Sequence, residues 1–264
     1  GTWRSFAVRN PQLIGNRVKA LATAADGTLW AATEAGVQQL VAGEPPRLFD
    51  AANGGPTPLG VRTLLGGPEG GIWVGGQQGG SFFDGEELQS FTAQTGLAGD
   101  TVQAITVDGE GRTWFGGERG LSVWNGSSFF IINASQGLPS EDIRALLADE
   151  NGVWIGTAGG GLYRFEGNQL QLLNSRNVGL PSDNITALAA GGDGSGDGSG
   201  DALWIGTDRG LARLAGGAVT SVDALNEDEI RTLAVTAGGD VWVGRADGGV
   251  FYGIRTTQIA PPDL

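Results

Sequence analysis

The sequence predicts an all-β protein built from repeated four-stranded antiparallel sheets, and three observations predict it. A short tryptophan box recurs every 38 to 50 residues, at Trp30, Trp73, Trp114, Trp154, Trp204 and Trp242. Short apolar runs, rich in branched and aromatic residues, flank each box. The 264 residues include 49 Gly, and turn residues interrupt every apolar run before it is long enough to show the 3.6-residue period of a helix. These signals are typical of a repeat protein whose units are sheets.

The clearest unit shows how four strands follow from the residues. An apolar run at 143–146 and a turn at 150–152 lead into the box at 153–157. A Gly-rich loop then precedes a third run at 161–165, and a fourth run follows at 169–173. Runs this short, separated by Gly, Asn and Asp, predict an antiparallel meander. Because such a sheet cannot bury both faces alone, six of them predict a six-bladed β-propeller.

We expect the propeller to be one domain over residues 1–264. Residues 2–6 lack a box and resemble an outer strand, so they are expected to complete the last blade and close the ring, which removes a free sheet edge. Residues 257–259 could fill the same place, in which case the N-terminal residues would be a loosely attached tail. The blades are expected at about 17–51, 60–93, 101–133, 142–174, 184–222 and 229–259.

The fifth unit is longer because residues 191–201 are inserted between its first and second strands. Asp193, Asp197 and Asp201 recur there every four residues, which makes them a weak candidate for a calcium loop. Calcium loops normally place their oxygen ligands closer together, and a flexible Gly/Ser linker explains the stretch equally well. No other cofactor is expected.

Composition excludes several function classes. The net charge of −13 and the pI near 4.3 argue against a nucleic-acid binder, which needs a basic footprint. The chain has no Cys and no His, so disulfides, thiol chemistry and the usual general base and metal ligand are absent. No apolar stretch reaches the length of a membrane span. The lack of Cys suits an extracytoplasmic, periplasmic or secreted protein.

Two stretches carry a resemblance to a known family. One is Gly137-Leu138-Pro139-Ser140 followed by Asp149 to Gly152 and the box at 153–157. The other begins at Gly179-Leu180-Pro181-Ser182 and continues through the box at 203–207 to Gly210 and Leu211. Both resemble the two-component regulator propeller repeat, and the other four units look like more divergent copies. The chain differs from the family in having six boxes where seven blades are common.

The resemblance implies an extracytoplasmic sensor module, the ligand-binding half of receptors that respond to polysaccharide fragments.

In a propeller, the loops that enter first strands and those that join second to third strands share one face. Cations gather at these places. One aligned position of the first strands holds Lys19, Arg62, Arg144 and Arg231, with Gln103 and Thr186 in the other two units, and the second-to-third loops add Arg119, Arg209 and Arg245.

These seven cations predict a ligand-binding site for an anionic oligosaccharide, because Arg grips carboxylate or sulfate with two parallel donors. A structural interpretation competes with this one. Acidic residues lie just before the cations, so each cation could instead pair with a carboxylate of its own or the neighbouring blade; these acids are Asp100, Glu141, Asp142, Asp183, Asp228 and Glu229.

Two other functions stay open as alternatives. A protein-interaction scaffold would use the acidic surface. A polysaccharide lyase or hydrolase would need two carboxylates drawn from residues such as Asp142, Asp183 and Glu229. No catalytic residue is predicted, because Ser and Tyr have no His partner. The box tryptophans are expected to pack between blades, whereas Trp3 and Trp124 lie outside the box and are better candidates for exposure.

Overall fold

The structure is a computed structural model that describes residues 13–15, 17–41, 44–56, 60–192, 201–236, 239–248 and 250–252. The chain divides into two compact units. The first is Gly1–Val107 with Gly111–Ile132, and the second is Asp108–Glu110 with Asn133–Leu264.

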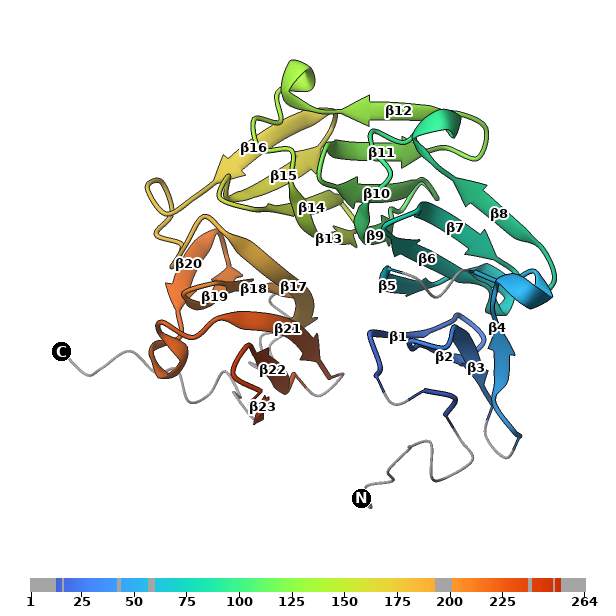
Figure 1. The fold of residues 1–264 in the computed structure, drawn as a ribbon. Helices are drawn as coiled ribbons and strands as arrows, with labels where there is room; N and C mark the ends of the chain where they lie inside the picture. The colour runs from blue at the N-terminus through green and yellow to red at the C-terminus, as the bar shows by residue number, and fades with distance from the viewer. Residues whose placement is uncertain are drawn as a thin grey trace. The chain divides into compact units, whose positions relative to one another are not determined.

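The first unit contains three antiparallel sheets, each a meander of four consecutive strands (Figure 1). Three short 3-10 helices lie in its loops, at Ala51–Asn53, Pro68–Gly70 and Ala93–Thr95. The strands are β1 (Ala20–Thr23), β2 (Leu29–Ala32), β3 (Val37–Leu40), β4 (Arg47–Phe49), β5 (Val61–Gly66), β6 (Ile72–Gly76), β7 (Gly79–Phe83), β8 (Leu88–Phe91), β9 (Val102–Val107), β10 (Thr113–Gly117), β11 (Gly120–Trp124) and β12 (Phe129–Ile132).

The second unit repeats this order, with two four-stranded sheets and a sheet of three described strands. Its 3-10 helices are Ala134–Gln136 and Asp223–Leu225. The strands are β13 (Ile143–Asp149), β14 (Gly152–Thr157), β15 (Leu162–Glu166), β16 (Gln169–Leu173), β17 (Ile185–Gly192), β18 (Asp201–Thr207), β19 (Gly210–Ala215), β20 (Ala218–Ser221), β21 (Ile230–Val235), β22 (Val241–Arg245) and β23 (Val250–Tyr252).

The prediction of four-stranded antiparallel meanders is confirmed in five sheets. In the part of the chain that the structure describes, the sixth sheet ends at β23 with three strands. The closing strand at residues 2–6 and its alternative at 257–259 both lie outside the described residues. The six-blade count, the ring closure and the single domain therefore stay predictions.

Four of the six box tryptophans are buried in the core, as expected. Trp30, Trp114 and Trp204 are fully buried, and Trp73 is 8% exposed, whereas Trp154 and Trp242 are half-buried. In the first unit the indole N–H of Trp30 donates to the Gly70 carbonyl of the next sheet at 3.1 Å. This contact joins two sheets, because the large ring reaches across their shared face while its one polar atom finds a partner.

Three of the boxes end in a threonine, and its side chain closes the turn that follows. The hydroxyls of Thr33, Thr157 and Thr207 donate to the carbonyls of Gly36, Gly161 and Gly210, at 3.4, 2.8 and 2.9 Å. These glycines have positive φ, which glycine adopts without steric cost. The box thus determines both the second strand and the tight turn to the third.

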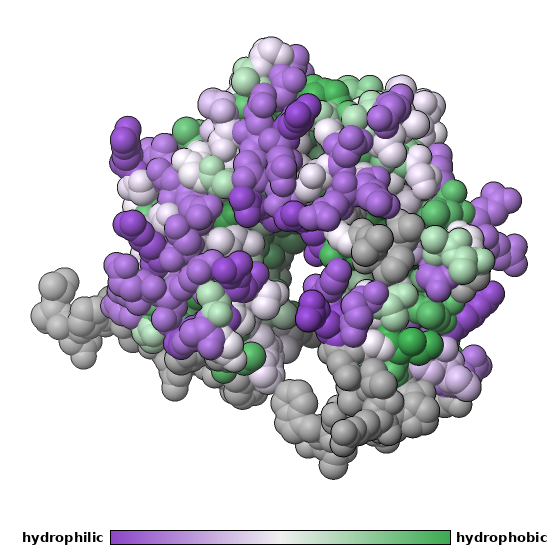
Figure 2. All heavy atoms as spheres, in the orientation of Figure 1, coloured by the Kyte–Doolittle hydropathy of each residue, from purple (hydrophilic) through white to green (hydrophobic). Residues whose placement is uncertain are grey.

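Figure 2 shows that hydrophilic side chains cover much of the visible face of both units, with smaller hydrophobic patches among them. This distribution follows from the strands, whose apolar residues face neighbouring sheets while charged and amide side chains gather in the loops.

Candidate functional site

The leading loop of a sheet, which runs into its first strand, lies beside the turn between its second and third strands. Backbone N–H groups of that turn donate to the leading loop in four sheets. The pairs are Gln77 to Gly60 (3.1 Å), Ala158 to Asp142 (2.9 Å), Asp208 to Asn184 (3.3 Å) and Ala246 to Glu229 (2.9 Å). The two kinds of loop therefore share one end of each of these sheets, as expected.

A β-bulge occurs at this same end in five sheets. Val61 pairs with Gly76 and Thr63 with Gly75, so Arg62 is the extra residue between them. The same register shift leaves Gln103, Arg144, Thr186 and Arg231 as the extra residues of β9, β13, β17 and β21. Bulges re-aim side chains and are common beside binding sites. We call the leading loop, the bulge residue and the adjacent turn the bulge end of a sheet.

The bulge explains why the aligned position holds polar residues. The Val or Ile before it is buried, whereas Arg62, Arg144 and Arg231 are exposed. Lys19 is also exposed and lies just before β1, where its N–H donates to the Ala32 carbonyl at 2.8 Å. The register thus gives Arg62, Arg144 and Arg231 the same bulge position, whereas the β1–β2 pairing has no bulge at Lys19.

In the first unit the cations lack acidic partners. Among the residues that the structure describes, Lys19, Arg62 and Arg119 make no ion pair. Arg62 Nη1 instead donates to Gln103 Oε1 at 3.4 Å, which brings the bulge residues of two neighbouring sheets side by side. Arg119 lies against Gly99 of its own leading loop, where an added Cβ would be 3.2 Å from its Cδ.

In the second unit most of the cations are paired within their own sheet. Arg144 donates to Asp142 through Nε (2.9 Å) and Nη2 (2.7 Å). Arg231 pairs with Glu229 at 2.7 Å. Arg245 pairs with Asp247 and with Asp228, the latter at 3.1 Å. The hydrogen bond that Arg245 donates to Asp247, followed by the charge of Asp228, raises the pKa of Arg245.

Arg209 is the remaining predicted cation. It is exposed and makes no ion pair with any described residue. Its neighbour Asp208 is partly buried, which disfavours the charged carboxylate. Hydrogen bonds from Ser182 and Asn184 and the charge of Arg209 outweigh this burial, so the pKa of Asp208 lies below its ordinary value. Arg209 therefore helps to hold a carboxylate ionised.

The acids named beside the cations have two different roles. Asp142, Asp228 and Glu229 form the ion pairs given above. Asp100, Glu141 and Asp183 instead accept backbone N–H groups of the preceding connection, from Ala93 (2.8 Å), Ala134 (2.9 Å) and Ser175 (2.6 Å). These three carboxylates hold the loop between sheets. The structural alternative thus applies to Arg144, Arg231 and Arg245, and not to the cations of the first unit.

The residue two places before each of these four cations carries a signal that the sequence interpretation did not use. It is Asp142 before Arg144 and Glu229 before Arg231, and these carboxylates reach the guanidinium. It is Gly60 before Arg62 and Arg17 before Lys19, which offer no carboxylate. Among the four first-strand cations, the identity of this one residue separates Arg144 and Arg231, which are paired, from Lys19 and Arg62, which make no ion pair with a described residue.

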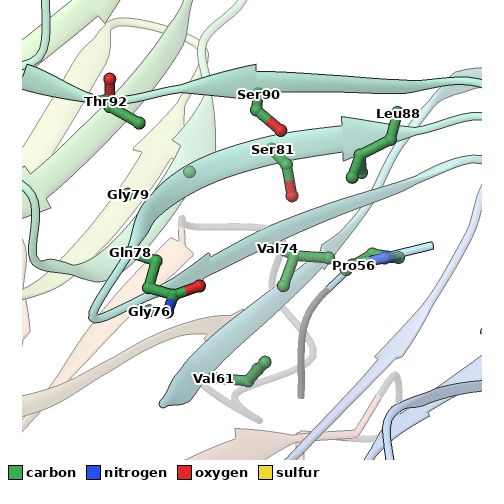
Figure 3. Close-up of a pocket in the computed structure, with 11 residues that line it drawn as sticks. Pro56, Val61, Val74, Gly76, Gln78, Gly79, Ser81, Leu88, Ser90 and Thr92 are labelled. Atoms are coloured by element: carbon green, nitrogen blue, oxygen red, sulfur yellow. The ribbon is translucent and has the colours of Figure 1, made fainter. Parts of the chain in front are cut away.

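A pocket of about 330 Å³ lies beside the bulge end of the β5–β8 sheet, and sequence reasoning missed it. Val61, Val74, Leu88 and Pro56 supply its apolar lining (Figure 3). Its polar lining consists of the side chains of Gln78, Ser81, Ser90 and Thr92. Ser81 and Ser90 are directly opposed on β7 and β8, and Figure 3 shows both on the side of the sheet that carries Val74.

The calcium candidate receives no support from the described residues. Asp193 and Asp197 lie outside them, and nothing of the Asp201 side chain is described. Within the described part of the chain, no group of three or more His, Cys, Asp or Glu side chains could hold a metal ion. Nor does any described helix have the length and apolar character needed to cross a membrane.

Residues 137–159 match the family model described as "Two component regulator propeller". The match covers one of the stretches that carry the resemblance seen in the sequence, including the box around Trp154. The recognition of this repeat is therefore confirmed. A search of the curated proteins finds no match.

Solved structures similar to the chain include two extracellular domains from B. thetaiotaomicron. One belongs to a putative hybrid two component system (TM-score 0.75, 18% identity), and it matches 97% of this chain and 36% of its own. The other belongs to a putative one component system (TM-score 0.68, 19% identity), with 91% and 34% covered. The chain thus spans about a third of the length of either structure.

A third similar structure is a catalytically inactive virginiamycin B lyase from Staphylococcus aureus with quinupristin. Its TM-score is 0.66 at 14% identity, with 91% of this chain and 86% of the lyase covered. All three similarities concern the fold, and they show that the chain has an all-β propeller fold.

Proposed function

We propose that this chain, which carries the two component regulator propeller repeat, is a non-enzymatic, extracytoplasmic sensor. It binds an anionic oligosaccharide at its bulge ends. The family match and the extracellular origin of two similar structures support the sensor role and the location. The oligosaccharide class is inferred from the chemistry of the cations.

The observation that carries the proposal is the set of exposed cations without acidic partners. Lys19, Arg62 and Arg119 are exposed and make no ion pair with a described residue. A guanidinium offers parallel donors that match carboxylate or sulfate. Because the chain has a net charge of −13, an anion is repelled by most of the surface and attracted only where such cations gather.

The engaged carboxylates support a binding role over an enzymatic one. Asp142 and Glu229 are held by arginines, and Asp183 accepts a backbone N–H. A general acid or base must be able to exchange its proton with a substrate, and these groups already have partners. The similar lyase was made inactive by replacing a His, a residue type that this chain lacks altogether.

The test is thermal unfolding of the chain with neutral, uronic and sulfated oligosaccharides at low and high salt. A ligand at about a hundred times its Kd should stabilise the folded state by about 2.7 kcal/mol. We expect only the anionic sugars to do so, and the effect to shrink as salt screens the charges. Arg62→Gln, which copies the residue at Gln103, should weaken binding about tenfold, or about 1.4 kcal/mol.

Arg144→Gln is the matched control, because Asp142 already neutralises that guanidinium. It should change binding little and lower the unfolding free energy by no more than about 1 kcal/mol, the value of an exposed ion pair. If no anionic sugar stabilises the wild type, the proposal fails and the scaffold interpretation replaces it. If Arg62→Gln and Arg144→Gln weaken ligand binding equally, the ligand site includes the paired cations as well as the unpaired ones.

A further inference from the structure

Asn-Gly dipeptides occur in the turns of two described β-hairpins. Asn125-Gly126 lies between β11 and β12, and Asn151-Gly152 lies at the turn from β13 to β14. In such a dipeptide the backbone nitrogen can attack the preceding side-chain amide, because glycine has no side chain to obstruct the approach. Whether this reaction occurs in the folded protein depends on what the attacking nitrogen and the amide already contact.

The Asn125 side chain is exposed, and its carbonyl group is polarised. Asn125 Oδ1 accepts hydrogen bonds from the backbone N–H groups of Ser127 (3.0 Å) and Ser128 (2.9 Å) and from the Ser127 hydroxyl (3.0 Å). Three donors on one oxygen withdraw electron density from the amide carbon, and they stabilise the oxyanion that forms when a nucleophile attacks that carbon. The turn therefore activates the Asn125 amide as an electrophile.

The nitrogen that would attack is unrestrained. The Gly126 N–H group makes no hydrogen bond with any residue that the structure describes. A Cβ built on Gly126 would have no atom within 4 Å, so the turn has room for the backbone to move. Gly126 can thus lose its amide proton to water or hydroxide and close a ring onto Asn125.

Three other asparagines in described turns are protected at this nitrogen. The N–H group that follows each of them donates to a carboxylate, which holds the proton in place and disfavours the amide anion. The three pairs are Ala134 with Glu141 (2.9 Å), Gly152 with Asp149 (3.1 Å) and Ser175 with Asp183 (2.6 Å). Asn133 and Asn174 accept backbone N–H groups much as Asn125 does, so the difference lies in the attacking nitrogen.

We propose that Asn125 is a self-modification site that deamidates in the folded protein. The Gly126 nitrogen forms a bond to Asn125 Cγ, which closes a succinimide ring. The bond from Cγ to the side-chain nitrogen breaks, and that nitrogen leaves as ammonia with the proton that Gly126 gives up. Water then opens the ring at either carbonyl and yields aspartate or isoaspartate.

The modification changes one end of the β9–β12 sheet. Either product adds one negative charge to the turn, and isoaspartate also lengthens the backbone next to the first pair of the hairpin, Trp124 with Phe129. β11 separates this turn from Arg119, which precedes the strand at its other end. The inference is therefore independent of the proposed function, and deamidation should leave binding at the cations unchanged.

The test is incubation of the folded chain in mildly alkaline buffer, followed by peptide mass spectrometry at each asparagine. Heavy-oxygen water identifies the succinimide route, because ring opening adds one heavy oxygen. The same chain unfolded in urea is the reference, since both Asn-Gly dipeptides should react at similar rates once the structure is lost. Asn125→Gln is the matched variant, because it keeps an exposed amide but would have to close a larger ring.

We expect Asn125 to deamidate at least tenfold faster than Asn151 in the folded chain, and the two rates to converge in urea. Isoelectric focusing should show one added negative charge in the wild type and not in Asn125→Gln. The proposal is overturned if Asn125 stays intact in the folded chain while the unfolded chain reacts, or if Asn151 reacts as fast as Asn125 in the folded chain. An equal amount of the acidic species from Asn125→Gln would also overturn it.

Discussion

At the scale of single residues, Asp149 organises the end of the β13–β14 hairpin. Its carboxylate accepts Trp154 Nε1 (2.9 Å), Arg164 Nη2 (2.5 Å) and the Asn151 backbone N–H (2.8 Å). Arg164 is only 6% exposed and stacks over Trp154, with its guanidinium carbon 4.6 Å from the ring centroid. Asp149 is the nearer carboxylate of this nearly buried cation, and the exposed Glu166 lies 3.6 Å from its Nε.

This pairing predicts a pH-sensitive loss of stability. Partial burial opposes ionisation of Asp149, but the hydrogen bonds and the charge of Arg164 outweigh it, so its pKa is lowered. A carboxylate with a lowered folded-state pKa adds stability above its unfolded-state pKa of about 3.9. That stability is lost as pH falls through the folded-state value.

Asp149→Asn should therefore lower the unfolding free energy by about 1–3 kcal/mol at neutral pH, because Arg164 loses its nearer carboxylate and keeps only the exposed Glu166. Its difference from wild type should narrow below about pH 4. Urea unfolding at several pH values measures both effects. Glu150→Gln, a neighbouring exposed carboxylate, should be neutral. A loss that is the same at every pH would contradict the role of the Asp149 charge.

At the scale of elements, sheets pack through matched pairs of positions. The residue after the turn glycine belongs to the same hydrophobic cluster as the third box residue of the next sheet. These pairs are Val37 with Val74, Leu162 with Ile205 and Leu211 with Val243. The pair between β7 and β10 is Gly80 with Phe115, where an added Cβ would be 2.6 Å from the Phe115 ring. A large ring thus fills the space that a missing side chain leaves.

Exchanging sizes across this pair gives a test of sheet packing. Gly80→Leu should overpack the contact and cost about 1–3 kcal/mol or more. Phe115→Ile should leave a cavity, which is also destabilising. The double variant restores the Leu and Ile combination seen at Leu162 and Ile205, so it should be more stable than the sum of the single effects. A double-mutant cycle measured in urea tests this coupling, and additive losses would contradict it.

At the scale of the whole molecule, the described chain ends with an incomplete sheet. Among the described residues, β23 is the last strand of this sheet and pairs with β22, and Val250 on it is 67% exposed. The other five sheets have a fourth strand at this place. The sequence predicts that residues 2–6 supply it, with residues 257–259 as the alternative.

Two truncations distinguish these predictions. Deletion of residues 1–9 should lower the melting temperature by several degrees if residues 2–6 pair with β23, because an exposed strand edge loses its ladder and its apolar cover. Deletion of residues 255–264 should then have little effect. The reverse result would assign the fourth strand to the C-terminal residues, and no effect from either deletion would contradict ring closure by the chain itself.

Strand order and the buried tryptophans were predictable from the sequence, because a meander depends on local turns and on a repeat that places each box on the second strand. The position of the cations was predictable for the same reason, since Arg62, Arg144 and Arg231 follow one aligned apolar residue. Whether each arginine forms an ion pair depends on the residue two places before it. Asp142 and Glu229 place a carboxylate beside a guanidinium at the bulge, whereas Gly60 gives Arg62 no carboxylate. The pocket was decided by tertiary structure alone, because Val61, Ser81 and Ser90 share no sequence pattern and meet only when their strands pair and Pro56 folds over them.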